Sequence, residues 1–383
     1  MIEYEETFGV GRDVSSGVGA VTAVGFLLLA PILGRVGDIY GVKRAVLLGG
    51  SIAAASYMLT SVSQEIWQIY IWQGFLFGMG AGMGYLASAA VVSQWFEKRR
   101  GFATSLAVAG GGVGNILIPP LTQHLFDRHG WRNAALVLGF VFFGCTILSA
   151  MFAKRRLPLI TGKDAILFKP EWGVWKNRSF CIVAFNLFIF EWAFIIPLYH
   201  LAASAKEKGV SRAGQASIIS MIGVGNLIGR LTSGLVTDRI GLKRMVLFTQ
   251  FCTAVVIAVW PALESQTSFQ IASCFFGVFA CAFWAQLPVL VAHAVGVRKL
   301  GGAIGMIMPA MAPGGIAAAP LAGYLFETSG SYTSTAIFTA SLLVVALAAI
   351  SQLSSVPYAE RERETDAQAG KDEKAGDEGA GGA

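Results

Sequence analysis

Two stretches of the chain, GRVGDIYGVKR at residues 34–44 and GLVTDRIGLKR at residues 234–244, are near copies of one another. Six of their eleven positions are identical, and the copies lie 200 residues apart. A fixed offset held over a long stretch of sequence indicates two halves of similar structure. The same offset matches further pairs on both sides, including Gly9–Gly209, Val10–Val210, Arg12–Arg212, Gly101–Gly301, Ala103–Ala303, Gly114–Gly314, Pro120–Pro320 and Gly130–Gly330.

The composition is that of a membrane protein with many spans. Hydrophobic residues make up 55% of the 383 residues and charged residues only 14%, whereas soluble domains carry about 25% charged residues. The fold class is therefore all-α and polytopic. Eleven segments are apolar over the roughly 20 residues that a membrane-spanning helix needs, and they are 15–34, 45–62, 67–93, 102–126, 133–153, 179–203, 214–235, 245–264, 268–293, 302–326 and 333–353.

One connection between these segments is longer than the others and divides the chain. It covers residues 154–178, which leaves a bundle of five spans in residues 1–153 and one of six spans in residues 179–354. Residues 355–383 are rich in Glu, Asp, Lys, Gly and Ala and are expected to form a disordered cytoplasmic tail. Because the offset aligns the start of the chain with the loop after span 179–203, we expect a twelve-helix fold that lacks its first helix.

Lysine and arginine residues are concentrated on one side of the predicted membrane. Eighteen of the 29 lie in one set of alternate loops, which includes segment 154–178, and six lie in the other set together with the N-terminal stub. The positive-inside rule makes the first set cytoplasmic. The net charge of +6 is thus explained by topology, and we expect no nucleic-acid partner.

The sequence contains no recognisable motif of enzymes, nucleotide sites or metal sites. The five cysteines and four histidines lack metal-ligand spacing. The GGGVGN run at residues 110–115 lies inside an apolar span and not between a strand and a helix. We therefore expect no enzymatic activity, cofactor or metal. The expected partners are a small-molecule solute, membrane lipid and, if movement of the solute is coupled, a proton.

The duplicated G-x-x-x-D-x-x-G-x-K-R loops resemble the signature of the major facilitator superfamily. WFEKRRGFATSLAVAGGGVG at 95–114, GWRNA at 130–134 and FIIPLYHLAASAKEKG at 194–209 resemble the monocarboxylate porter family, above all its fungal branch. The resemblance covers roughly residues 4–355. It implies two bundles around a central cavity, and secondary active or facilitative transport of small organic anions or metabolites by alternating access.

Other functions stay open under this resemblance. Because the fungal branch carries varied solutes, efflux of a secondary metabolite made by a biosynthetic gene cluster is the main alternative. A transporter-like sensor fits less well with a short central loop and a low-complexity tail, and an inactive truncated product is a further alternative. The expected location is multi-pass in the plasma membrane, with the vacuolar membrane as the alternative.

Each signature loop places a carboxylate at the cytoplasmic end of a span. Such a carboxylate can accept hydrogen bonds from a neighbouring helix N-terminus and favour its dipole, while glycines permit the tight turn and the cations supply counter-charges. The cluster either latches the two halves together when the site opens outward or only anchors the topology, and the resemblance favours a latch formed by Gly34, Asp38, Gly41, Lys43, Arg44, Gly234, Asp238, Gly241, Lys243 and Arg244.

Two charged residues lie deep within predicted spans, where charge is costly and indicates function. Arg230 lies in span 214–235 and Glu191 in span 179–203. The guanidinium of Arg230 can bind a carboxylate through two hydrogen bonds. The alternative is a structural ion pair between Arg230 and Glu191. Both residues are candidates for substrate binding.

Two amides complete the candidate substrate site. Asn226 lies one helical turn before Arg230, on the same helix face. The resemblance implies an acidic residue there in proton-coupled monocarboxylate transporters, and an amide cannot release a proton near neutral pH. This departure argues against proton symport through Asn226 and leaves Glu191 as a substitute proton carrier. Asn115 lies among glycines in a helix whose equivalent lines the cavity in this superfamily.

Overall fold

The computed structural model describes residues 4, 7–10, 12–96, 98–161, 166–168 and 170–354, apart from the side chains of residues 12–16, 115, 119 and 212. Every regular element in these ranges is a helix, so the predicted all-α class is confirmed. The predicted disordered tail, 355–383, lies outside the described residues.

The helices of the chain fall into two successive groups. The first group comprises α2 (Arg12–Leu27), α3 (Ala30–Tyr40), α4 (Val42–Ser61), α5 (Ile66–Ile69), the π-helix η1 (Tyr70–Leu76), α6 (Phe77–Trp95) and α7 (Arg100–Phe152). The second comprises the short 3-10 helix η3 (Trp172–Lys176), α8 (Arg178–Glu207), α9 (Arg212–Ile240), α10 (Leu242–Val259), the 3-10 helix η4 (Trp260–Ala262), α11 (Gln266–Val295), α12 (Leu300–Ile307), the 3-10 helix η5 (Met308–Met311), α13 (Ala312–Ser329) and α14 (Tyr332–Ser351).

The prediction of eleven spans is confirmed only in part. Within the described residues, eight helices are long and apolar enough to cross a membrane, or nine if the bent pair α2–α3 counts as one span. One reason is that α7 joins the expected segments 102–126 and 133–153 into 53 residues, with a non-helical residue at Gly130. The other is that α4 has the length of a span but carries Lys43 and Arg44 in its first turn and contains serines and glycines, which lower its hydropathy.

The backbone repeats with the offset that the sequence predicts. Gly41 ends α3 with a φ of 93°, and Gly241 ends α9 with a φ of 89°. A positive φ is unfavourable for residues with a Cβ, so the signature loop needs glycine at this point in both copies. Of the seven glycines with positive φ in the described chain, six form pairs at the 200-residue offset: Gly9–Gly209, Gly41–Gly241 and Gly130–Gly330.

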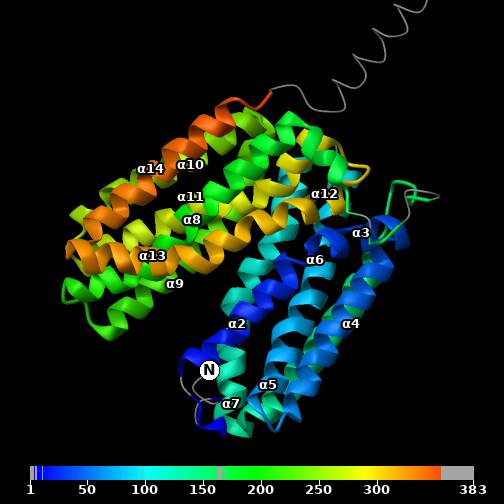
Figure 1. Cartoon of the computed structure of the whole chain (residues 1–383), viewed down its shortest axis with the longest axis horizontal. Helices are drawn as coiled ribbons and strands as arrows, with labels where there is room; N and C mark the ends of the chain where they lie inside the picture. Colours follow the sequence, from blue (N-terminus) through cyan, green and yellow to red (C-terminus); the bar gives the residue numbers. More distant parts are fainter. Residues whose placement is uncertain are drawn as a thin grey trace, which may run out of the picture.

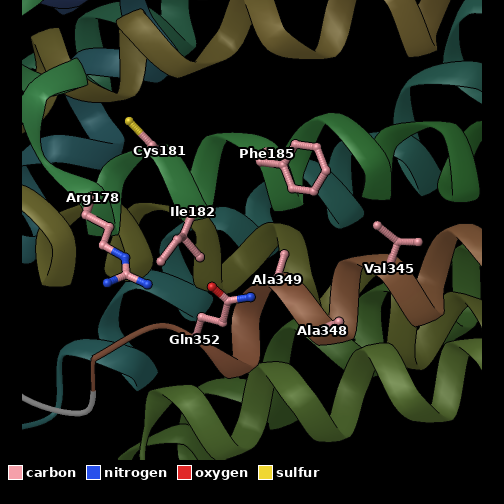
Figure 2. Close-up of a pocket in the computed structure, with 8 residues that line it drawn as sticks. All are labelled: Arg178, Cys181, Ile182, Phe185, Val345, Ala348, Ala349 and Gln352. Atoms are coloured by element: carbon pink, nitrogen blue, oxygen red, sulfur yellow. The ribbon is translucent and has the colours of Figure 1, made fainter.

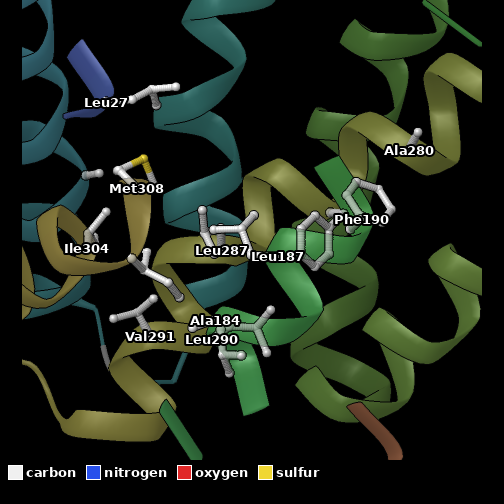
Figure 3. Packing of buried hydrophobic residues seen from close by; sticks show 14 of the residues in the cluster. Leu27, Ala184, Leu187, Phe190, Ala280, Leu287, Leu290, Val291, Ile304 and Met308 are labelled. Carbon is white, nitrogen blue, oxygen red and sulfur yellow. The ribbon is translucent and has the colours of Figure 1, made fainter. Parts of the chain in front are cut away.

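The two groups of helices form two bundles that together make a V (Figure 1). They meet where α3 packs on α12 and where α7 packs on α9, at the end that the cation distribution assigns to the cytoplasm. Buried apolar residues extend through the second bundle, and Figure 3 shows Leu187 and Phe190 of α8 close to Leu287 of α11. This packing fixes α11, which supplies Trp284 to the wall of the central cavity described below.

Candidate functional site

The first contact between the bundles is the α3–α12 seam. Asp38 Oδ2 accepts a hydrogen bond of 2.9 Å from the backbone N–H of Gly302, in the first turn of α12. Gly34 faces the backbone of Gly301 so closely that a Cβ on Gly34 would overlap the Gly301 carbonyl. Glycine is therefore required on both sides of the contact. We define the α3–α12 seam by Gly34, Asp38, Gly301, Gly302 and Gly305.

The second contact, the α7–α9 seam, repeats the first with the halves exchanged. Asp238 accepts hydrogen bonds from the backbone N–H groups of Gly101, at 2.9 Å, and Phe102, at 3.0 Å. The offset of 200 residues relates Asp38 and Gly302 to Asp238 and Phe102. We define this seam by Gly101, Phe102, Ser105, Val108, Arg230, Ser233, Gly234 and Asp238.

The counter-charge on Asp38 comes from a residue outside the signature. Arg155, in the central segment, donates to Asp38 Oδ1 at 3.2 Å and to the Gly37 carbonyl at 2.7 Å. The sequence assigned the counter-charges to the signature cations. Instead, Lys43 and Arg44 are exposed, as is Arg244, while Lys243 donates to the Leu353 carbonyl at 2.7 Å.

A carboxylate of the central segment, Glu171, bridges the bundles at the α3–α12 seam. Glu171 forms an ion pair with Arg35 of α3 through one oxygen, and its other oxygen lies 3.3 Å from Lys299 Nζ, at the start of α12. The Arg35 side chain is buried. In the sequence, the charges of segment 154–178 indicated only the topology of the chain and did not predict this bridge.

Arg230 of α9 lies in the α7–α9 seam. Its Nη1 donates to the Val108 carbonyl of α7 at 2.8 Å, so the side chain crosses from one bundle to the other. Its Nε is buried and has no hydrogen-bond partner among the described residues. A permanent cation with an unpartnered Nε donor, held between the halves, is suited to bind an anion.

Of the other predicted site residues with described side chains, Asn226 lies near Arg230 on α9, while Glu191 is not paired with it. Among the described residues, no ion pair joins Arg230 to Glu191: the Glu191 side chain is buried against Gly314 of α13, and its Oε2 has no partner there. Asn226 lies one turn from Arg230, with its Oδ1 buried and without a described partner. The side chain of Asn115 lies outside the described part of the structure.

A cavity of about 500 Å³ lies between the bundles. Its wall includes Tyr85 of α6, which lies within electrostatic range of Arg230, although Arg230 itself is not one of the lining residues. Most of the wall is apolar, and residues of that kind give no signal in a sequence that is apolar throughout. The lining residues are Gly19, Thr22, Ala23, Phe26, Gly78, Ala81, Tyr85, Trp284, Met308 and Met311.

A groove of about 400 Å³ on the second bundle is a poorer candidate for the site. It runs between α8 and α14 and takes no residue from the first bundle (Figure 2); its lining consists of Arg178, Cys181, Ile182, Phe185, Val345, Ala348, Ala349 and Gln352. Across the described ranges, no three His, Cys, Asp or Glu residues come together in a way that could hold a metal ion. The central cavity with Arg230 is therefore the candidate site.

Relatives of known name share the sequence pattern over most of the chain. Monocarboxylate transporter 12 of Xenopus laevis is 26% identical over 365 residues, which are 87% of this chain and 78% of that protein. MFS-type transporter 1 of Ophiocordyceps sp. (strain BCC 1869) is 26% identical over 324 residues, covering 84% of this chain and 72% of that protein.

Solved structures share the fold. The E. coli Fucose:proton symporter FucP superposes with a TM-score of 0.72 at 13% identity, over 92% of each chain. The human organic anion transporter MFSD10 superposes with a TM-score of 0.70 at 16% identity, over 91% of this chain and 87% of that one. The family model described as Major Facilitator Superfamily matches residues 1–201 and 180–376. The chain therefore belongs to the Major Facilitator Superfamily, a family of multi-pass membrane transporters and not of enzymes.

Proposed function

We propose that this transporter carries a small organic anion by alternating access, with Arg230 as the group that binds the anion. The observation that supports this most directly is the position of Arg230. It is a permanent cation within electrostatic range of Tyr85 in the cavity wall, with one donor bonded across the α7–α9 seam to Val108 and another donor without a described partner. Several relatives are named monocarboxylate transporters, which agrees with an anionic solute.

The same position suggests how binding is coupled to opening. Both seams are closed at the predicted cytoplasmic end, so the solute enters from the opposite side. An anion bound to the unpartnered donors of the guanidinium neutralises its charge and so weakens its charge-assisted bond to the Val108 carbonyl. Weakening this bond loosens the α7–α9 seam and favours the inward-open arrangement, since a ligand shifts an equilibrium by its difference in affinity for the two states.

Uptake by the full chain in proteoliposomes tests the role of Arg230. We expect Arg230→Gln to lower uptake of labelled monocarboxylates by about 10- to 100-fold, the effect of losing a charged hydrogen bond of about 1.5–3 kcal/mol. Arg230→Lys keeps the positive charge but cannot form two parallel hydrogen bonds to a carboxylate, so it should lower uptake less than Arg230→Gln does. Arg239→Gln, which removes an exposed cation from the same helix, is the matched control. Normal uptake by Arg230→Gln would exclude Arg230 as the anion-binding group.

Glu191 is our proposed site for a coupling proton. Its carboxylate is buried with an oxygen that lacks a described partner, and burying an unpaired charge costs several kcal/mol. Uptake should increase when the side of entry is acidified, and Glu191→Gln should abolish this increase. Glu207→Gln, an exposed change on the same helix, should retain it. If wild-type uptake is indifferent to the pH gradient, proton coupling is excluded.

A further inference from the structure

The wall of the central cavity is aromatic and thioether-rich. Phe26 of α2 and Tyr85 of α6 come from the first bundle, and Trp284 of α11 faces the cavity from the second. Met308 and Met311 lie in η5, where the helix between Leu300 and Ser329 is interrupted. Flat rings and polarizable sulfur atoms favour contact with an aromatic or other ring-shaped body.

Among the described residues of this wall, one buried polar atom lacks a hydrogen-bond partner, and it is a donor. The Thr22 hydroxyl is engaged with the carbonyls of Val18, at 3.0 Å, and Gln73, at 3.3 Å. Trp284 Nε1 is buried and has no hydrogen-bond partner among the described residues, and an indole N–H can only donate. A buried donor without a partner costs about 1–3 kcal/mol, so a solute with an acceptor oxygen at this point would be favoured.

Trp284 is held in place before any solute arrives. Its ring centroid lies 5.6 Å from that of Phe194 and 5.8 Å from that of Phe283, both in edge-to-face arrangements. Across the cavity, Phe26 and Tyr85 pack edge-to-face with centroids 5.8 Å apart. Rings fixed in this way lose little conformational entropy on binding, which increases the affinity for a rigid, flat solute.

The size of the cavity excludes a close fit to a very small acid. Its volume of about 500 Å³ is within the roughly 300–1,000 Å³ of sites that enclose drug-sized ligands. An acid of the size of propanoate would contact Arg230 but leave most of the apolar wall facing water. A larger apolar body would cover that wall.

We propose that the solute is a ring-bearing monocarboxylate whose ring system carries an acceptor oxygen. Its carboxylate binds Arg230 near Tyr85, and its ring lies against Phe26 and the two methionines. The acceptor oxygen accepts a hydrogen bond from the Trp284 Nε1–H. This inference rests on the proposed function, since it takes Arg230 as the anion site, and adds the chemistry of the rest of the solute.

A matched set of probes tests the inference on the purified full chain in nanodiscs. Thermal unfolding is followed against concentration of 3-phenylpropanoate, 3-(4-hydroxyphenyl)propanoate, propanoate and 3-phenylpropan-1-ol. We expect the phenyl acid to bind about 10- to 100-fold more tightly than propanoate, the gain from burying one ring, and the hydroxylated acid to bind at least as tightly as the phenyl acid. The alcohol, which lacks the charge, should bind more weakly than either ring acid.

Two variants separate specific binding from partition into lipid. Phe26→Leu should weaken the binding of the phenyl acid but not that of propanoate. Trp284→Phe keeps a ring but removes the N–H, so it should weaken the binding of the hydroxylated acid most. Phe185→Leu, in the α8–α14 groove, is the control and should change neither. Equal binding of propanoate and the phenyl acid overturns the inference and leaves the proposed function standing. Equal binding of the alcohol and the phenyl acid overturns both. The wild-type series decides these points even if a variant does not fold.

Discussion

At the scale of single residues, Arg230 and Ala30 occupy equivalent positions of the repeat, and they make the two seams different. The Ala30 carbonyl lies against Gly305, so the α3–α12 seam closes by backbone contact. In the α7–α9 seam, the Arg230 side chain reaches Val108 instead. The sequence predicted that Arg230 is functional, because a charge within a span is costly. It did not predict the partner, because a main-chain carbonyl leaves no signal in the sequence.

The close approach at Gly34 gives a residue-scale prediction. In Gly34→Val the new side chain would overlap the Gly301 carbonyl, so the α3–α12 seam cannot close, and overpacking of this kind costs about 1–3 kcal/mol. We expect uptake to fall at least about fivefold, since 1 kcal/mol is roughly a factor of five in an equilibrium. Initial uptake rates in proteoliposomes check this.

The control for this prediction is Gly323→Val in α13, where a Cβ would meet open space. It introduces the same β-branched residue into a helix but should leave uptake within about twofold of the wild type. If Gly34→Val transports as well as the control, contact between α3 and α12 is not needed in the transport cycle.

At the scale of elements, the apolar segments were predictable, but the points where helices join or break were not. The chain bends by 46° between α2 and α3, where Pro31 lies in the first turn of α3 and cannot continue a helix from α2. Pro309 likewise lies in η5. Yet Pro197 and Pro288 lie inside uninterrupted helices α8 and α11. Proline therefore marks where a break can occur, and the packing of neighbouring helices decides whether it does.

Asp38 and Asp238 accept hydrogen bonds from the N-termini of α12 and α7, and these contacts lead to a prediction about stability. Asp38→Asn leaves Arg155, whose side chain is 7% exposed, without its counter-charge, and breaking a buried pair costs about 3–5 kcal/mol. Asp238→Asn loses mainly the attraction of a charge to a helix N-terminus, about 0.3–1 kcal/mol. We therefore expect Asp38→Asn to lower the unfolding temperature in nanodiscs more than Asp238→Asn does. Equal shifts would show that Arg155 adds nothing to the signature contact.

At the scale of the whole molecule, the repeat in sequence predicted two similar bundles, and the paired glycines with positive φ agree with it. The boundaries drawn at residues 153, 178 and 354 stay a prediction. Hydropathy could not predict that the segment between the bundles contacts both, because Arg155 and Glu171 contact partners more than 100 residues away. Such partners follow only from the assembled fold.

The last prediction concerns the movement of one bundle against the other. The hydroxyl oxygens of Ser105 and Ser233 lie 3.4 Å apart and buried, one on each side of the α7–α9 seam. In the double variant Ser105→Cys/Ser233→Cys, the two sulfur atoms are close enough for a disulfide to form with small adjustment. Oxidation should then hold the cytoplasmic end closed and stop uptake, while a reductant should restore it.

The design of this experiment distinguishes a blocked cycle from a damaged protein. Each single cysteine variant, oxidised in the same way, controls for the five native cysteines, all of which are free thiols, and should transport before and after oxidation. The oxidised double variant should still bind a solute presented from the external side, because the cavity lies beyond the α7–α9 seam on that side. Undiminished uptake with the disulfide formed would mean that the bundles do not separate along α7 and α9, and alternating access through this seam would be excluded.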